Sequence, residues 1–238
     1  MTETVVDIRD LTVRFGGHVA LSGVDFSLNS GEAVGLIGVN GAGKTTLMNC
    51  ICGLQSASGG SVRVRDKDVR GLPSHEIARL GIGRTFQNPR VFRKMTLLDN
   101  MLVPALDASD SDGVLTARAE ALLDRMKLLP LRHNYAQELS GGQQKLLELA
   151  RLLMRDPSVV LLDEPFAGVH PVLCKFMIEQ IGQLSNEGKA VLLISHDVTS
   201  IYRLSRRLVA LHQGKVIASG AVEEVRNHPA VIESYLGA

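Results

Sequence analysis

The chain has 238 residues, enough for one large domain or two closely packed subdomains around a buried core. Hydrophobic residues make up 45% of it and charged residues 21%, a balance that excludes a disordered chain. The net charge of +1, with 4% aromatic residues and no Trp, gives no reason to expect a nucleic-acid partner.

The first third of the chain contains short apolar runs separated by glycines and polar turns. Strands are predicted over 5–11 and 24–28. The continuous apolar run over 33–38 is typical of a strand buried on both faces, and a helix is predicted over 45–54. Valines that alternate with charged residues over 61–65 predict a strand of an edge hairpin.

The middle of the chain, 97–155, is rich in Leu, Ala and Arg at helical spacing, with a polar loop at 107–113. Buried strands are predicted at 158–163, 190–195 and 208–213, and an amphipathic helix at 175–187. Strands that alternate with helices predict an α/β domain with a mainly parallel sheet. The helical middle is predicted to be a subdomain inserted into this core.

The sequence has no apolar stretch near the ~20 residues that a membrane-spanning helix needs, and its first ten residues lack the apolar region of a secretory signal. We therefore expect a chain that is soluble by itself and reaches a membrane only through a partner. The three cysteines, Cys50, Cys52 and Cys174, lack the spacing of a metal site, and we expect small buried side chains in a reducing compartment.

The strongest motif lies between the strand predicted at 33–38 and the helix that follows. Residues 38–45 read GVNGAGKT, which matches the phosphate-binding loop pattern of Gly, four residues, Gly-Lys-Ser/Thr. Glycines let backbone N–H groups surround phosphate oxygens, and the helix adds its positive end. Lys44 is predicted to reach the terminal phosphates, the hydroxyl of Thr45 to bind Mg²⁺ and that of Thr46 to contact phosphate. The candidate nucleotide-binding residues here are Gly38, Asn40, Gly41, Ala42, Gly43, Lys44, Thr45 and Thr46.

An acidic pair follows the apolar run Val159–Leu162, which is the Walker B arrangement. Asp163 is predicted to hold Mg²⁺ through water at the end of the strand. Glu164 is the candidate base that polarises the attacking water, provided that the backbone turns after the strand to aim it at the γ-phosphate; Pro165 favours such a turn. Together with the phosphate loop, the pair indicates a P-loop ATPase or GTPase.

A second anion site is predicted where Leu139-Ser140-Gly141-Gly142-Gln143 precedes an apolar helix. Ser140 is placed to cap that helix, and the two glycines allow close approach of the backbone. This segment resembles the LSGGQ signature of the ATP-binding cassette (ABC) family, and it follows the phosphate loop and precedes the acidic pair in the family's order. The candidate ligand-binding residues are Ser140, Gly141, Gly142 and Gln143.

The resemblance to ABC ATPases covers the whole chain and assigns further residues. Gln87 is similar to the glutamine that contacts Mg²⁺ and water and links the core to the helical subdomain, and His196 to the histidine that contacts the γ-phosphate. Phe15 has the place of the aromatic residue that stacks on adenine, although a core phenylalanine on an edge strand is the alternative. With Lys44 and Glu164, Gln87 and His196 complete the candidate catalytic set; Thr45, Gln87 and Asp163 are the candidate metal ligands.

The resemblance also implies an architecture: a P-loop NTPase core with a mainly parallel sheet, an N-terminal antiparallel β subdomain and an inserted helical subdomain. We expect one ABC ATPase domain over 1–238, with its nucleotide-binding core at about 1–87 and 156–238 and its helical subdomain at about 88–155. ATP and Mg²⁺ are the implied cofactors. The family pairs two ATPases head to tail, each signature capping the other's ATP, and hydrolysis lets the two halves part.

Implied partners are transmembrane permease subunits, a second ATPase subunit, the same or different, and indirectly a periplasmic or extracellular solute-binding protein. The implied location is the cytoplasmic face of the inner membrane. The segments GIGRTFQN at 81–88 and VFRKMT at 91–96 look like the branched-chain amino acid importers, as does the C-terminal Tyr235-Leu236-Gly237. Urea or amide importers, the lipopolysaccharide-export ATPase, soluble ABC ATPases and a nucleotide-binding module without hydrolysis are the alternatives.

One position departs from the family pattern. His170 stands in the loop after the acidic pair where the family usually has Asp. In the family this loop crosses the dimer interface and couples the two sites. We therefore expect simple tolerance of His170, a weaker coupling or a pH-sensitive coupling.

Overall fold

The computed structural model describes residues 3–236, and its strands form two sheets. The four-stranded sheet has the order β2-β1-β4-β5 and is antiparallel. Its strands are β1 (Thr4–Phe15), β2 (His18–Asn29), β4 (Gly59–Val64) and β5 (Lys67–Asp68). The six-stranded sheet has the order β10-β9-β3-β8-β7-β6, and only its pairing of β10 with β9 is antiparallel. Its strands are β3 (Ala33–Ile37), β6 (Ile82–Arg84), β7 (Val159–Asp163), β8 (Ala190–Ile194), β9 (Arg207–His212) and β10 (Lys215–Ala221).

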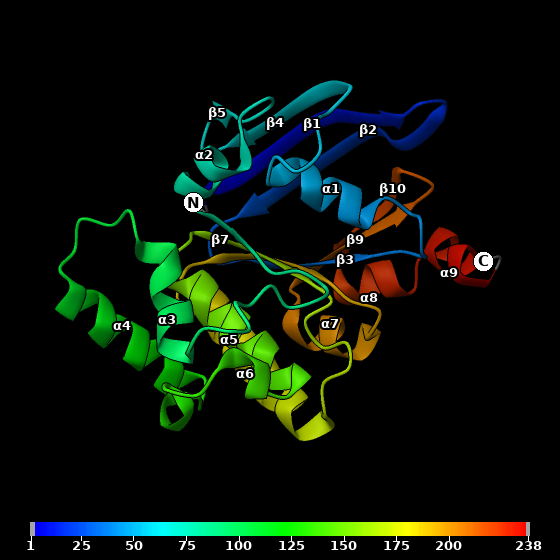
Figure 1. Ribbon diagram of the computed structural model, residues 1–238. Coiled ribbons are helices and arrows are strands. Elements are labelled where there is room, and N and C mark those ends of the chain that lie inside the picture. Colours follow the sequence, from blue (N-terminus) through cyan, green and yellow to red (C-terminus); the bar gives the residue numbers. More distant parts are fainter. Residues whose placement is uncertain (1–2, 237–238) are drawn as a thin grey trace.

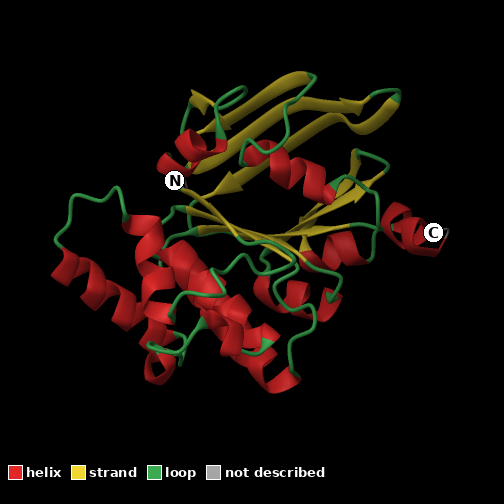
Figure 2. Cartoon of the chain, viewed as in Figure 1, coloured by secondary structure: helices red, strands yellow, loops and turns green. Residues whose placement is uncertain are grey.

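Helices lie between the two sheets and on the outer face of the six-stranded sheet (Figures 1 and 2). Helix α1 lies between the two sheets, and the helices of the middle of the chain lie on the opposite face of the six-stranded sheet. In chain order the helices are α1 (Lys44–Ile51), α2 (Ser74–Arg79), α3 (Leu97–Leu102), α4 (Asp112–Arg125), α5 (Gly141–Leu153), α6 (Pro171–Asn186), α7 (Val198–Leu204), α8 (Val222–Arg226) and α9 (Pro229–Leu236). This arrangement confirms the predicted α/β class with a mainly parallel sheet and an N-terminal antiparallel sheet.

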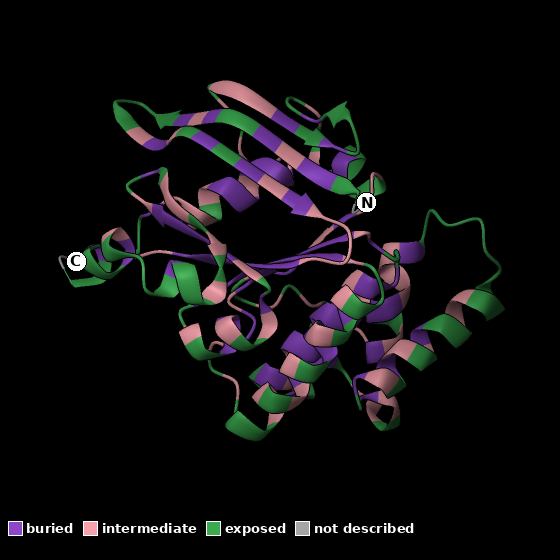
Figure 3. Ribbon diagram, turned by 180° about the vertical axis from the view of Figure 1, so that it is seen from behind, coloured by how far each residue is buried: buried purple, intermediate pink, exposed green. Residues whose placement is uncertain are grey.

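The central strands are buried on both faces because their side chains alternate between two cores. In β3, Val34 and Leu36 join the core shared with the antiparallel sheet and α1, whereas Ala33 and Ile37 join the core shared with α5 and α6. Figure 3 shows buried residues on both sides of this sheet. The continuous apolar runs therefore position the ends of β3 and β7 rigidly, and both candidate motifs begin there.

The helical middle of the chain shares its core with the sheet. Leu97 and Met101 of α3, Leu123 of α4 and Leu146 of α5 belong to the same buried cluster as Val160 of β7. The predicted division of the chain at about 88 and 155 stays a prediction. Among residues 3–236, no helix is long and apolar enough to cross a membrane.

Candidate nucleotide site

The loop between β3 and α1 has the backbone of a phosphate cradle. Gly38 has φ 146°, and a Cβ there would lie 2.2 Å from the carbonyl oxygen of Leu211. Gly43 has φ 106° and precedes the first turn of α1; its Cβ would lie 2.8 Å from the carbonyl oxygen of Ala20. Only glycine fits these two positions, and the loop opens onto a helix N-terminus, which favours an anion.

A cavity of about 360 Å³ lies at this loop and brings together residues that are far apart in sequence. From the candidate set it is lined by Phe15, Asn40, Gly41, Ala42, Gly43, Lys44, Thr45, Thr46, Gln87, Asp163 and Glu164. Parallel strands β3 and β7 end at the same edge of the sheet, which explains why the two motifs meet. The cavity therefore combines an aromatic ring, the backbone and ammonium group of the loop, and the two acids.

Lys44 folds over the loop, where its Nζ donates to the carbonyl oxygens of Gly38 at 2.6 Å and Val39 at 2.9 Å. Burial lowers the pKa of Lys44, and the nearby carboxylates of Glu164 and Asp163 oppose that shift. The ammonium group thus lies on the loop, within the influence of the acidic pair, where it can neutralise phosphate charge.

The candidate Mg²⁺ ligands suit a hard cation because they are oxygen donors from three segments: the Thr45 hydroxyl, the Asp163 carboxylate and the Gln87 amide. Within residues 3–236 no cluster of three or more His, Cys, Asp or Glu side chains forms a self-sufficient metal site, so the ion would need phosphate and water ligands as well. Asp163 is fixed by Arg84, whose Nη2 lies 3.0 Å from Asp163 Oδ2 with both side chains nearly buried.

Glu164 lies where the backbone turns sharply after β7. Its φ is 51°, in the left-handed region that is uncommon for residues other than glycine, so the turn expected from the sequence is present. The carboxylate Oε2 lies 2.8 Å from His196 Nδ1 and accepts the backbone N–H of His196 at 3.2 Å. The structure therefore brings together the predicted base and the predicted histidine.

The signature segment lies outside this cavity. Ser140 caps α5: its hydroxyl accepts the N–H of Gln143 at 3.3 Å, and Gln143 Oε1 accepts the N–H of Ser140 at 3.0 Å. Gly142 packs closely on α6, since a Cβ there would lie 2.6 Å from Leu173 Cδ2. Gln143 lines a separate cavity with His170, whose Nδ1 accepts the N–H of Val172 at 3.3 Å and so caps α6.

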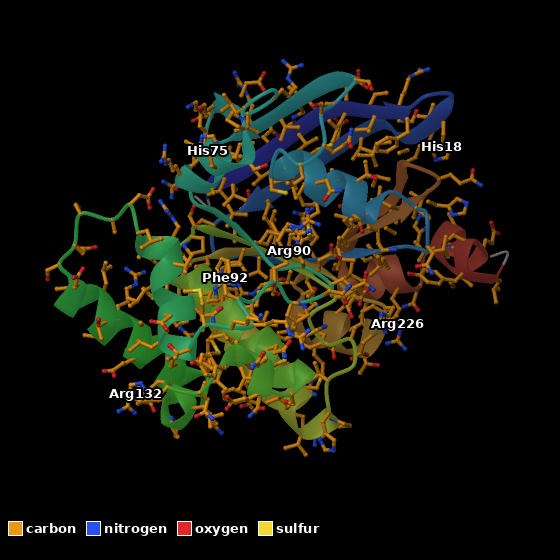
Figure 4. The ribbon with its side chains drawn as sticks, in the orientation of Figure 1. His18, His75, Arg90, Phe92, Arg132 and Arg226 are labelled. Atoms are coloured by element: carbon orange, nitrogen blue, oxygen red, sulfur yellow. The ribbon has the colours of Figure 1, made fainter. Side chains whose placement is uncertain are left out.

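Sequence reasoning missed several residues of the site. His18, Ala20 and Ile194 also line the cavity, and the Tyr235 hydroxyl accepts the N–H of Gly38 at 2.9 Å. His18 is paired with Phe15 across the β1–β2 hairpin and lies at the hairpin tip in Figure 4. The Gly-Gly dipeptide at 16–17 is a hairpin signal that could have indicated this pairing. The C-terminal segment that resembles the importers includes Tyr235, but the sequence did not indicate its contact with Gly38. Gly237 of that segment lies outside the described residues.

The glycine cradle, the facing acids and the parallel sheet define the chain as a P-loop nucleotide-binding protein. Two sequence families match it: "ABC transporter" over residues 21–167 and "Branched-chain amino acid ATP-binding cassette transporter" over residues 215–238. The chain belongs to the ABC transporter family and is an ATPase of that family.

Relatives of known function agree with this assignment. The chain is 39% identical to the high-affinity branched-chain amino acid transport ATP-binding protein LivG of Escherichia coli K12, covering 100% of this chain and 99% of that protein. It is 37% identical to the lipopolysaccharide export ATP-binding protein LptB of Acidithiobacillus ferridurans, covering 92% of this chain and 91% of that protein.

Solved structures are similar over nearly the whole fold. The ADP conformation of MJ1267, an ATP-binding cassette of an ABC transporter, superimposes with a TM-score of 0.88 at 32% identity, covering 99% of both chains. A dimeric post-hydrolysis state of the cassette MJ0796, bound to ADP and Pi, has a TM-score of 0.81 at 25% identity, covering 91% of this chain and 98% of that one.

Proposed function

We propose that this ABC ATPase binds and hydrolyses MgATP at the cavity between the phosphate loop and the acidic pair. The observation that carries the proposal is the single cavity that joins Phe15, Lys44, Thr45, Asp163 and Glu164. Phe15 stacks on adenine. The loop, with Lys44 and Thr46, holds the phosphates, and charge-assisted hydrogen bonds of this kind are the strong ones. Thr45, Asp163 and Gln87 would hold Mg²⁺, which would supply charge stabilisation on the phosphates.

Glu164 accepts a proton from, or polarises, the water that attacks the γ-phosphate. His196 contacts Glu164 through both its ring and its backbone N–H, and therefore holds that carboxylate in place and adds a donor beside the γ-phosphate. Catalysis then depends on positioning and on charge stabilisation rather than on a covalent intermediate.

The signature of this chain acts on a second subunit's nucleotide. Residues 140–143 do not line the chain's own cavity, and Ser140 and Gln143 cap the exposed start of a helix that can receive an anion. Head-to-tail pairing with another ATPase subunit completes both sites. That two cassettes pair at all is supported by the dimeric cassette to which the chain is similar. Hydrolysis removes the shared γ-phosphates and lets the subunits separate.

We infer that the transporter imports branched-chain amino acids, with this subunit on the cytoplasmic face of the membrane beside its permease subunits. The match over residues 215–238 and the full-length similarity to LivG support this solute class. The similarity to LptB supports lipopolysaccharide export as the second candidate.

The test is purification of the tagged chain from its native membrane in mild detergent, with mass spectrometry of what accompanies it. Multi-span permeases and a second ATPase, together with binding of leucine by the associated solute-binding protein, are the expected result. Recovery of a lipopolysaccharide-export permease would replace the import assignment and leave the ATPase assignment standing. Recovery with ribosomal or DNA-associated proteins would contradict the transporter role.

A further inference from the structure

Helix α5 carries two charged side chains on its buried side. Lys145 is 7% exposed and Glu148 is 6% exposed, and they lie three residues apart on the same side of the helix as Leu149. Burying charge is costly unless each group has a polar partner. None of the roles assigned above uses either residue, so their partners indicate what they do.

Lys145 contacts the loop of the proposed base. Its Nζ donates a hydrogen bond of 2.6 Å to the backbone carbonyl oxygen of Glu164. Glu164 has a φ of 51°, and that conformation points its carboxylate at His196. A cation bound to this carbonyl favours the peptide orientation that the turn requires and opposes the alternatives in which the carbonyl rotates away.

The electrostatic surroundings of Lys145 are consistent with this contact. Burial lowers the pKa of Lys145, and the carboxylates of Glu148, Glu164 and Asp163 oppose that shift because they favour the ammonium form. The ammonium form donates three hydrogen bonds and is the stronger partner for a carbonyl oxygen.

Glu148 contacts the loop that carries Gln87. Its Oε1 accepts the N–H of Arg90 at 2.8 Å, and its Oε2 accepts the N–H of Phe86 at 3.4 Å. These two amides lie on either side of Gln87, and Figure 4 shows Arg90 near the centre of the molecule, above α5. The guanidinium carbon of Arg90 lies 3.8 Å from the centroid of the Phe86 ring, a second contact between the two ends of this loop.

We propose that Lys145 is a positioning residue for ATP hydrolysis, because it fixes the backbone that aims Glu164. Lys145 attaches the loop of Glu164 to helix α5, and Glu148 attaches the loop of Gln87 to the same helix, which begins at the signature. This inference rests on the proposed function, because it needs Glu164 as the base. Its consequence is that the helix which contacts the partner subunit's nucleotide also holds the base of its own site.

Three variants of the full chain, assembled with its transporter partners, test the proposal. Lys145→Met keeps the length of the side chain and removes the donor, Lys145→Arg keeps a charged donor, and Lys175→Met removes an exposed lysine of α6 as the matched control. For Lys145→Met we expect kcat for ATP to fall on the order of 10²-fold, the effect of misplacing a catalytic group by ~1 Å, with KM nearly unchanged. Lys145→Arg is expected to recover most of kcat, and Lys175→Met to match the wild type.

Should Lys145→Met fold poorly, Lys145→Gln is the second variant, because it places a shorter neutral amide at the same position. Its expected result is a wild-type melting temperature with the same fall in kcat. A wild-type kcat in the folded variants would overturn the proposal, as would a parallel loss of kcat, nucleotide affinity and melting temperature that Lys145→Arg does not rescue. Absence of ATPase activity in the wild-type complex would instead contradict the proposed function itself.

Discussion

The ion pair between Arg84 and Asp163 predicts a large effect on stability. Nη2 of Arg84 lies 3.0 Å from Oδ2 of Asp163, and the two side chains are 7% and 10% exposed. Nη1 of Arg84 also contacts Cys52 Sγ at 3.2 Å and the Asn49 side chain. Arg84→Met therefore leaves a buried carboxylate without its charged partner, a change that costs roughly 3–5 kcal/mol.

The expected shift in melting temperature follows from the size of the chain. With an unfolding entropy of about 2.1 cal/mol/K per residue, a chain of this length has about 0.5 kcal/mol/K, so Arg84→Met lowers Tm by roughly 6–10 °C. Thermal unfolding followed by circular dichroism measures this. Adding MgATP is expected to narrow the gap, because Mg²⁺ supplies a new cation to Asp163.

The matched control is Arg70→Met, which removes an ion pair of similar length between Arg70 and Asp68 that is 45% and 41% exposed. Exposed pairs contribute little, so Tm is expected to stay at the wild-type value. The reasoning is refuted if Arg84→Met has the same melting temperature as the wild type, or if Arg84→Met and Arg70→Met lower the melting temperature equally.

Three further predictions concern the ring at the cavity, the thiols and the loop after the acidic pair. Phe15→Ala is expected to weaken binding of a fluorescent ATP analogue by roughly 1–3 kcal/mol, the usual contribution of base stacking, whereas Phe15→Tyr retains affinity; equal affinities for all three proteins would remove Phe15 from the adenine site. Burial raises the pKa of Cys50 to about 12, so iodoacetamide at mildly alkaline pH should modify the partly exposed Cys174 well before Cys50, as peptide mapping would reveal. His170→Ala removes the Nδ1 acceptor that caps α6 and is expected to cost roughly 0.5–2 kcal/mol of stability, whereas His170→Asn keeps a side-chain acceptor at the cap; equal melting temperatures of the two variants would show that this cap contributes nothing.

The buried strands and the loop between them could be predicted from the sequence because each has a continuous signal. The apolar runs of β3, β7, β8 and β9 indicate strands that are covered on both faces. The pattern GVNGAGKT is specific for a phosphate-binding loop between a strand and a helix. Strand β1, by contrast, extends to Phe15, beyond the predicted end at 11, since Asp10 adopts a φ of 48° and the strand continues after this irregularity.

Other elements had weak or misleading signals. Strand β10 has intermediate and exposed residues rather than an apolar run, and β6 is three residues long with Gly83 at its centre. Helix α6 begins at Pro171, four residues before the predicted start, because His170 caps it and proline suits the first helical turn. The predicted burial is confirmed for Cys50 and Cys52, whereas Cys174 is only partly buried.

The supporting contacts of the site could not be predicted from the sequence. Arg84, Lys145 and Glu148 read as ordinary charged residues, and their partners are 79, 19, 58 and 62 positions away along the chain. Three of these four contacts are with backbone atoms, which carry no sequence signal. Only the fold shows that these charges are buried and that they hold the segments carrying Asp163, Glu164 and Gln87.

The central claim is that Glu164 activates water at a site that binds MgATP, and the most direct measurement compares wild-type and Glu164→Gln protein for MgATP hydrolysis and ATP binding. We expect Glu164→Gln to bind ATP as the wild type does, to lose roughly 10²–10⁴-fold in kcat, and to form a dimer that persists on size-exclusion chromatography with ATP. Wild-type hydrolysis by Glu164→Gln, with no dimer in ATP, would contradict the account.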